Sequence, residues 1–198
     1  MRTLCLLIAL HVVCGANVEN NNENAIAEYK KLLHKKEMYW MLKRSYQDMR
    51  RDKNKTCVYT RSERTMPSTS TAKKYEVSQC FKEYDNGRAC ELYTVTLPWP
   101  QTGVPQPTMK WKKEGEENEQ EYTFRYWNGQ EKCFVISFAP NTDDIRCELH
   151  VFGTTTVPSV PSCDQQYKNI CNGTEYQVFF DDCLNQLGLS DSSGTASS

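Results

Sequence analysis

The sequence predicts an all-β fold, a barrel or a sandwich, with helices only near its two ends. Short strand-like segments follow one another from residue 38 to residue 151, and turn signals such as Asp85-Asn86-Gly87 and Asn128-Gly129 separate them. Helical periodicity occurs only before and after this region. Of the ten cysteines in 198 residues, eight lie beyond the first sixteen residues, which indicates up to four disulfides.

The first sixteen residues have the pattern of a secretory signal peptide. Arg2 precedes an apolar run over residues 4–13, and small residues follow it up to Ala16. The run is much shorter than the ~20 residues that cross a bilayer, so a membrane anchor is the weaker interpretation. We therefore expect a secreted, extracellular protein with one domain over residues 17–189 and a disordered Ser/Gly-rich tail over residues 190–198.

Composition argues against several classes of function. The formal net charge is −1 for the whole chain and about −2 without the leader, which does not favour nucleic acid or an anionic membrane as partners. The cysteines lack the spacing of zinc sites, and we expect no metal or other cofactor. Only His34 and His150 remain after the leader, and neither accompanies a nucleophile, so we do not expect an enzyme. Sequons at Asn54 and Asn172 predict glycosylation at exposed positions.

The first half of the domain begins with a helix and continues as strands. Ile26, Tyr29, Leu32 and Leu33 recur at helical spacing, which predicts a short amphipathic helix over residues 26–36. Segments 38–42 and 57–60 are typical of strands, whereas the Ser/Thr-rich segment 61–72 is expected to be a loop. Segments 75–84 and 89–97 form a predicted hairpin around a turn at Asn86-Gly87.

The second half continues the strands and ends in a helix. Segments 109–111 and 122–126 flank an acidic loop over residues 114–121, and segments 133–139 and 147–151 are the last predicted strands. A helix over residues 163–171 is indicated by a capping box in which Ser162 precedes Gln165 by three residues. Gly173 provides a left-handed residue after its end.

Alternation along the last two strands predicts which side chains face the interior. If Cys147 points outward to the helix, Glu148 and His150 point inward. By the same argument an outward Cys133 directs Phe134, Ile136 and Phe138 inward. A carboxylate inside an apolar barrel is costly unless a cation or a hydrogen-bond donor meets it, so Glu148 is the strongest candidate for a functional residue.

The chain resembles the tick salivary lipocalins, the family that includes the histamine-binding proteins, over nearly all of the mature sequence. The resemblance rests on the order and spacing of several short motifs: Tyr39-Trp40-Met41-Leu42, Ser45-Tyr46, Cys57-Val58, Phe124-Arg125-Tyr126, Asn128-Gly129-Gln130, Cys133-Phe134-Val135, Glu148-Leu149, Cys163, Tyr167, Cys171 and Cys183. It implies an eight-stranded antiparallel lipocalin barrel with a ligand cavity, a short N-terminal helix and a C-terminal helix packed on the outside.

The resemblance also implies a set of ligand-binding residues, with two departures from the family pattern. Glu148 and Tyr46 match amine-contacting positions, and Asp48 is offset by one residue from another. The family's Asp is Phe134 here and its aromatic residue is His150, so an apolar wall replaces one interior carboxylate. Together with Ile136 these residues form the predicted site. His150 is either a ligand contact, a pH-sensitive gate, or a hydrogen-bonded interior residue beside Glu148.

The function implied is that of a monomeric protein that sequesters a small host mediator and suppresses host inflammation or haemostasis. The mediator is a biogenic amine such as histamine or serotonin, or an eicosanoid or fatty acid. The alternative is an immunomodulator that binds a host immune protein, such as a complement inhibitor, through its surface loops.

The family pattern implies the disulfides Cys57–Cys183 and Cys133–Cys163, with Cys147–Cys171 as the natural third. Cys80–Cys90 remains by elimination. A two-residue turn at Asn86-Gly87 would set Cys80 opposite Tyr93, out of register with Cys90 and on the opposite face. Either the turn is longer than two residues or the pairing differs.

Overall fold

The computed structural model describes residues 19–83, 87–99, 106–141, 144–153, 159–171 and 174–187. The predicted leader and tail, Asn172 and Gly173 lie outside these residues. Among the described helices, none has the length and apolarity needed to cross a membrane.

The described strands form a closed antiparallel barrel of eight, as the resemblance implies, because the last long strand pairs with the first. In chain order they are β1 (Tyr39–Arg44), β4 (Thr56–Met66), β5 (Ala72–Lys82), β6 (Arg88–Pro98), β7 (Thr108–Lys113), β8 (Glu119–Asn128), β9 (Cys133–Phe138) and β10 (Arg146–Phe152). A short strand, β11 (Tyr176–Gln177), adds to β1. A separate ribbon of β2 (Met49–Arg50) and β3 (Lys53–Asn54) lies between β1 and β4 in the sequence.

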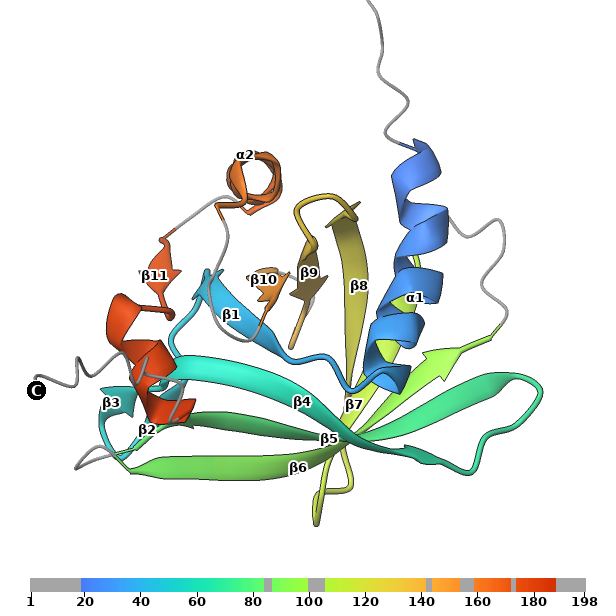
Figure 1. Cartoon of the computed structure of the whole chain (residues 1–198), viewed down its shortest axis with the longest axis horizontal. Coiled ribbons are helices and arrows are strands. Elements are labelled where there is room, and N and C mark those ends of the chain that lie inside the picture. Colours follow the sequence, from blue (N-terminus) through green and yellow to red (C-terminus); the bar gives the residue numbers. More distant parts are fainter. Residues whose placement is uncertain are drawn as a thin grey trace, which may run out of the picture.

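Two α-helices pack against different parts of the barrel (Figure 1). Helix α1 (Glu19–His34) contacts β8 and β4 and buries Ile26, Tyr29, Leu32 and Leu33, the residues whose spacing predicts it. Helix α2 (Pro161–Ile170) lies outside the barrel against β8, β9 and β10. A 3₁₀ helix (Asp181–Leu187) follows β11 and brings Cys183 to the start of β4.

The expected loop over residues 61–72 is too long, because strand β4 continues to Met66 and β5 begins at Ala72, which leaves a loop over residues 67–71. The polar residues that suggested a loop belong to a strand whose two faces differ. Thr60 and Ser62 are buried, whereas Arg61 is exposed and pairs with Glu63. Threonine is compatible with strands because its branched side chain packs on a pleated surface.

The hairpin between β5 and β6 has a longer turn than two residues. Cys80 pairs directly with Cys90 across the two strands, and the Glu83 amide donates to the Gly87 carbonyl at 2.8 Å. The turn therefore spans residues 83–87, of which residues 84–86 lie outside the described part. In this register the two thiols share one face, and the structure contains the disulfide Cys80–Cys90 together with Cys57–Cys183, Cys133–Cys163 and Cys147–Cys171.

The capping box predicted at the start of α2 is also wrong. The N-cap residue is Val160, and the helix makes no side-chain cap of its own. Glu131, in the turn between β8 and β9, supplies the cap instead by accepting hydrogen bonds from the Ser162 amide, the Ser162 hydroxyl and the Cys163 amide. A carboxylate satisfies the free N–H groups and the positive end of the helix at once, which the Ser162 hydroxyl alone would do less well.

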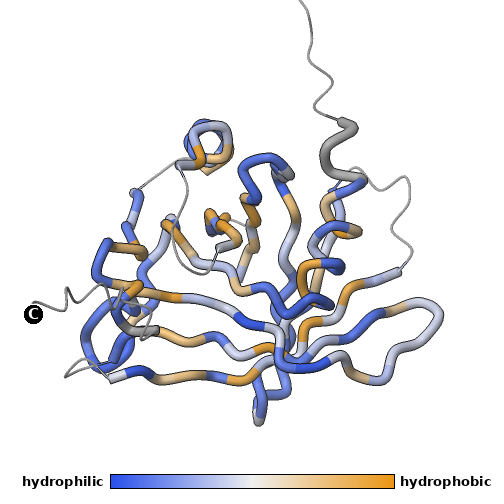
Figure 2. The backbone as a smooth tube through the Cα atoms, in the orientation of Figure 1, coloured by the Kyte–Doolittle hydropathy of each residue, from blue (hydrophilic) through white to orange (hydrophobic). Residues whose placement is uncertain are grey.

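The alternation predicted for β9 and β10 is confirmed by two separate clusters of buried residues. Phe134 and Ile136 belong to the cluster inside the barrel, whereas Cys133, Cys147 and Leu149 belong to the cluster beneath α2. Apolar and polar positions also follow one another along β5 and β6 (Figure 2). The two disulfides to α2 thus hold the outer faces of β9 and β10 and leave their inner faces to the barrel interior.

Candidate functional site

Glu148 lies on β10 inside the barrel and is only 4% exposed. Its two oxygens accept separate hydrogen bonds, one from the Tyr46 hydroxyl and one from Nε2 of His150 at 2.8 Å. Two inward residues of β10, Glu148 and His150, thus meet each other, as strand alternation predicts. No lysine or arginine of the described residues forms an ion pair with this carboxylate, although a buried charge is costly without a partner.

Arg44 is the nearest candidate for a permanent countercharge, because it lies opposite Glu148 in the β1–β10 ladder. Its guanidinium is turned to the segment after β1 instead. Nη2 donates to the Lys55 carbonyl at 2.9 Å, and Nη1 lies 3.6 Å from the Asp48 carboxylate. Asp48 also pairs with Lys55 at 3.4 Å. The predicted site residue Asp48 is therefore engaged in this ion-pair network rather than placed beside Glu148.

His150 is enclosed by aromatic rings and is 3% exposed. Its ring stacks on Phe134 with centroids 4.9 Å apart and an interplanar angle of 13°, and the Tyr39 ring meets it edge-on at 5.4 Å. Since a carboxylate only accepts hydrogen bonds, Nε2 is the protonated nitrogen toward Glu148. Nδ1 is buried and has no hydrogen-bond partner among the described residues.

The negative charge of Glu148 acts on the tyrosines around it. Burial raises the pKa of Tyr46 well above its usual value, and the adjacent Glu148 carboxylate raises it further. Burial and Glu148 act in the same direction on Tyr122, whose pKa is also well above its usual range. These phenols stay neutral at physiological pH and present hydroxyl groups and ring faces to the interior.

A small cavity of about 10 Å³ adjoins these residues, enough for about one water molecule. The hydrogen-bonded Glu148 and His150 line this cavity together with aromatic, amide and aliphatic side chains: Tyr39, Gln79, Trp111, Tyr122 and Ile136. The inner cluster of buried residues also contains Tyr29 of α1, whose hydroxyl bonds to that of Tyr39 at 2.8 Å. Among the described residues, the space directly beside Glu148 and His150 is therefore small.

A larger pocket of about 370 Å³ lies at the barrel end opposite α1 and shares Trp111 and Tyr122 with the small cavity. Its lining carries four carboxylates and two ammonium groups: Asp48, Glu91, Glu116, Glu119, Lys55 and Lys113. Glu91 pairs with Lys55 at 3.1 Å and with Lys113 at 3.0 Å. Burial raises the pKa of Glu91, but these two cations outweigh it and lower the pKa to about 2. The remaining carboxylates leave this mouth with a surplus of negative charge.

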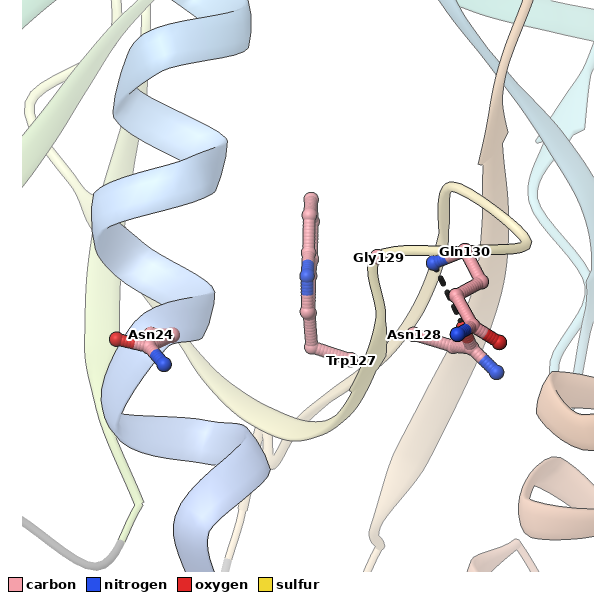
Figure 3. A pocket seen from close by; sticks show the side chains of 5 residues that line it. All are labelled: Asn24, Trp127, Asn128, Gly129 and Gln130. Atoms are coloured by element: carbon pink, nitrogen blue, oxygen red, sulfur yellow. Dashed lines mark hydrogen bonds between the residues drawn. The ribbon is translucent and has the colours of Figure 1, made fainter.

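A third hollow, of about 460 Å³, lies outside the barrel between α1 and the β8–β9 turn (Figure 3). It is lined by Asn24, Trp127, Asn128, Gly129 and Gln130, without any charged group. The side-chain oxygen of Asn128 already accepts a hydrogen bond from the backbone N–H of Gln130 at 2.9 Å. This hollow offers nothing to neutralise an ammonium group and shares no residue with the Glu148 cavity.

The structure brings together most of the residues predicted for the site. Glu148, Tyr46 and His150 form one hydrogen-bonded group, and Phe134 and Ile136 lie against it. Sequence reasoning missed Tyr39, Gln79, Trp111 and Tyr122, which come from β1, β5, β7 and β8. Trp111 and Tyr122 lie at inward positions of short strands, and only knowledge of the strand register would have placed them beside Glu148.

The predicted glycosylation position Asn54 differs from expectation. Asn54 is only partly exposed, and its side-chain oxygen is buried, so this sequon is not the exposed position expected.

Two groups of residues lie close enough together to be metal ligands, but each contains a disulfide pair, Cys57–Cys183 or Cys133–Cys163. Oxidised cysteines offer no thiolate, so neither group among the described residues is a metal site.

The family model for tick histamine-binding protein matches residues 17–185 of the chain. A search of curated proteins finds no match. Among solved structures, Japanin from Rhipicephalus appendiculatus, bound to cholesterol, is similar with a TM-score of 0.52 and 16% identity over 74% of this chain and 94% of Japanin. Lobster apocrustacyanin A1 is similar with a TM-score of 0.54 and 9% identity over 81% of this chain and 84% of that protein. At these identities the structural likeness supports the lipocalin barrel alone.

Proposed function

Because the chain belongs to the tick histamine-binding protein family, we propose that it sequesters a small host mediator whose cationic amine binds Glu148. The observation that carries this proposal is the buried carboxylate itself. Glu148 has two hydrogen-bond donors but no lysine or arginine partner among the described residues. A ligand ammonium would supply the missing charge and a charge-assisted hydrogen bond.

The surroundings of Glu148 favour an amine that carries an aromatic or apolar body. Tyr39, Tyr122 and Trp111 line the cavity beside the carboxylate, and aromatic rings attract cations and pack against flat ligands. Phe134 stands where the family pattern has an aspartate, so a second interior carboxylate is missing at that point. We therefore propose one ammonium in the inner site.

The ligand enters from the mouth, where acidic groups outnumber basic ones. Asp48, Glu116 and Glu119 line the larger pocket, and their field raises the local concentration of cations. Trp111 and Tyr122 line both this pocket and the small cavity. Because about 10 Å³ cannot hold an amine, these two side chains must turn aside when the ligand enters.

Calorimetry with histamine, serotonin, leukotriene B4 and arachidonate tests the proposal. An amine should bind, and Glu148→Gln should weaken it by at least about tenfold, because a hydrogen bond to a charged group contributes about 1.5–3 kcal/mol. Glu28→Gln is the matched control, since the Glu28 side chain is 45% exposed on α1, away from the acidic mouth, and this substitution should leave the affinity unchanged. Equal affinity in Glu148→Gln and wild type would refute the placement of the ammonium. If a lipid binds and neither amine does, the proposal of an amine ligand is refuted, and a lipid site in the apolar interior is favoured.

A further inference from the structure

We infer that the protonation state of His150 decides whether the site accepts a cationic ligand, because the positive charge of an imidazolium and that of the ligand's ammonium compete for the same Glu148 carboxylate. This inference rests on the proposed amine site. The two side chains lie two residues apart on β10, both inside the barrel, with Nε2 of His150 2.8 Å from Oε2 of Glu148. In the inferred competition one positive charge balances the carboxylate at a time, either an imidazolium or a bound ammonium.

Among the described side chains packed around Glu148, the His150 imidazole is the one that can change from neutral to positively charged. The other described residues near the Glu148–His150 pair, from the elements packed around it, carry no charge at neutral pH: Tyr29 of α1, Tyr39 and Met41 of β1, Tyr46 after β1, Gln79 of β5, Trp111 of β7, Tyr122 of β8, and Phe134 and Ile136 of β9. Two permanent cations, Arg44 and Arg146, lie over the Tyr46 ring at 5.4 Å and 5.3 Å, and they pair with Asp48 and Asp144 rather than with Glu148. Imidazole ordinarily takes up a proton within the physiological range, whereas a buried tyrosine does not lose one there.

The second ring nitrogen gives neutral His150 a direct role in binding. In the tautomer that donates from Nε2 to Glu148, Nδ1 carries a lone pair, and this atom is buried without a partner among the described residues. His150 lines the small cavity, so an N–H of the ligand entering there can donate to Nδ1. When His150 is protonated, Nδ1 becomes a donor and its charge repels the ammonium. Both effects favour cation binding to neutral His150 and oppose binding after protonation.

A proton balance follows from this competition. A cationic ligand that binds while His150 is protonated releases one proton to the solvent, and its affinity falls by up to about tenfold for each unit that the pH is lowered through the imidazole titration. An aromatic residue at position 150, as in the resembling family pattern, carries no such proton. The inferred consequence for this chain is capture of an amine at neutral pH and its release on acidification.

Calorimetry of the full mature chain with serotonin tests the inference, because the serotonin ammonium does not titrate between about pH 5.5 and 8.5. Affinity is measured across this range, and proton release is obtained from the binding heat in two buffers with different enthalpies of ionisation. His150→Gln keeps a donor for Glu148 and an acceptor for the ligand but cannot be protonated. His34→Gln removes the exposed histidine of α1 and is the matched control.

The expected result is an affinity that falls with acidification in wild type and in His34→Gln, with up to one proton released, and an affinity independent of pH in His150→Gln. A flat profile in wild type, or the same slope in His150→Gln, overturns the inference and leaves the amine site standing. Absence of serotonin and histamine binding at every pH overturns both the amine site and this inference.

Discussion

Tyr29 closes the barrel from the side of α1, and its removal should destabilise the fold while opening space inside it. The side chain is fully buried, and its ring lies edge-on to Phe124 at 5.3 Å and to Phe134 at 5.5 Å. Its hydroxyl shares a 2.8 Å hydrogen bond with Tyr39. Tyr29→Ala removes the ring and the hydrogen bond, whereas Tyr29→Phe removes only the hydroxyl.

The two substitutions separate packing from hydrogen bonding. Loss of the ring leaves a cavity on the order of 100 Å³, and with the lost burial of the ring the free energy of unfolding should fall by about 3–5 kcal/mol. Tyr29→Phe should lower it by about 1 kcal/mol, the usual net contribution of one hydrogen bond. The wall of the new cavity is aromatic, so a small apolar probe such as benzene should bind it.

Urea unfolding followed by tryptophan fluorescence, with the disulfides intact, measures both changes. Lys31→Ala is the control on the same helix, because Lys31 is exposed and its ion pair with Glu28 at 3.7 Å is a surface pair. It should change the free energy of unfolding by less than about 0.5 kcal/mol. A loss below about 1 kcal/mol for Tyr29→Ala, together with no benzene binding, would refute the reasoning that α1 is an integral part of the barrel core.

Two further predictions concern charged groups away from the barrel interior. Glu131→Ala should lower the free energy of unfolding by about 1–2 kcal/mol in urea titrations, because it removes the acceptor for the Ser162 and Cys163 amides at the start of α2; an unchanged midpoint would show that another group caps the helix. Glu91 has a pKa lowered to about 2, so its contribution to stability is complete above the ordinary carboxyl titration and is lost as the pH falls toward about 2. Wild type should therefore lose more stability than Glu91→Gln between about pH 5 and pH 2 in thermal unfolding, and parallel losses would contradict this role.

The inward and outward faces of the barrel could be predicted from the sequence because cysteines mark one face of two strands. Side chains alternate along a strand, so outward cysteines at positions 133 and 147 are sufficient to direct Phe134, Glu148 and His150 inward. The argument needs only the partner of each cysteine, a helix outside the barrel, and not the order of the other strands.

The features that could not be predicted depend on contacts between distant segments or on turn length. Glu131 caps α2 from another element thirty-one residues earlier than Ser162, and no local motif encodes that contact. The register of Cys80 and Cys90 depends on a turn of five residues, whereas the Asn86-Gly87 pair suggests a turn of two. The strand beyond residue 60 was missed because its polar residues alternate between a buried and an exposed face, a pattern that composition alone does not distinguish from a loop.

The small space beside Glu148 determines what an affinity for the proposed amine site would measure. This space holds about 10 Å³, so under the proposal a ligand gains its contacts only after Trp111 and Tyr122 have moved, and the cost of that movement is subtracted from its binding. If the open arrangement lies about 2–3 kcal/mol above the closed one, the apparent affinity is weaker than the intrinsic affinity by about 30- to 150-fold. Selectivity then arises from two requirements at once. The ligand must be compact enough to need little opening, and it must carry the positive charge that Glu148 lacks, which favours a small aromatic amine over a bulky cation or a neutral lipid of equal size.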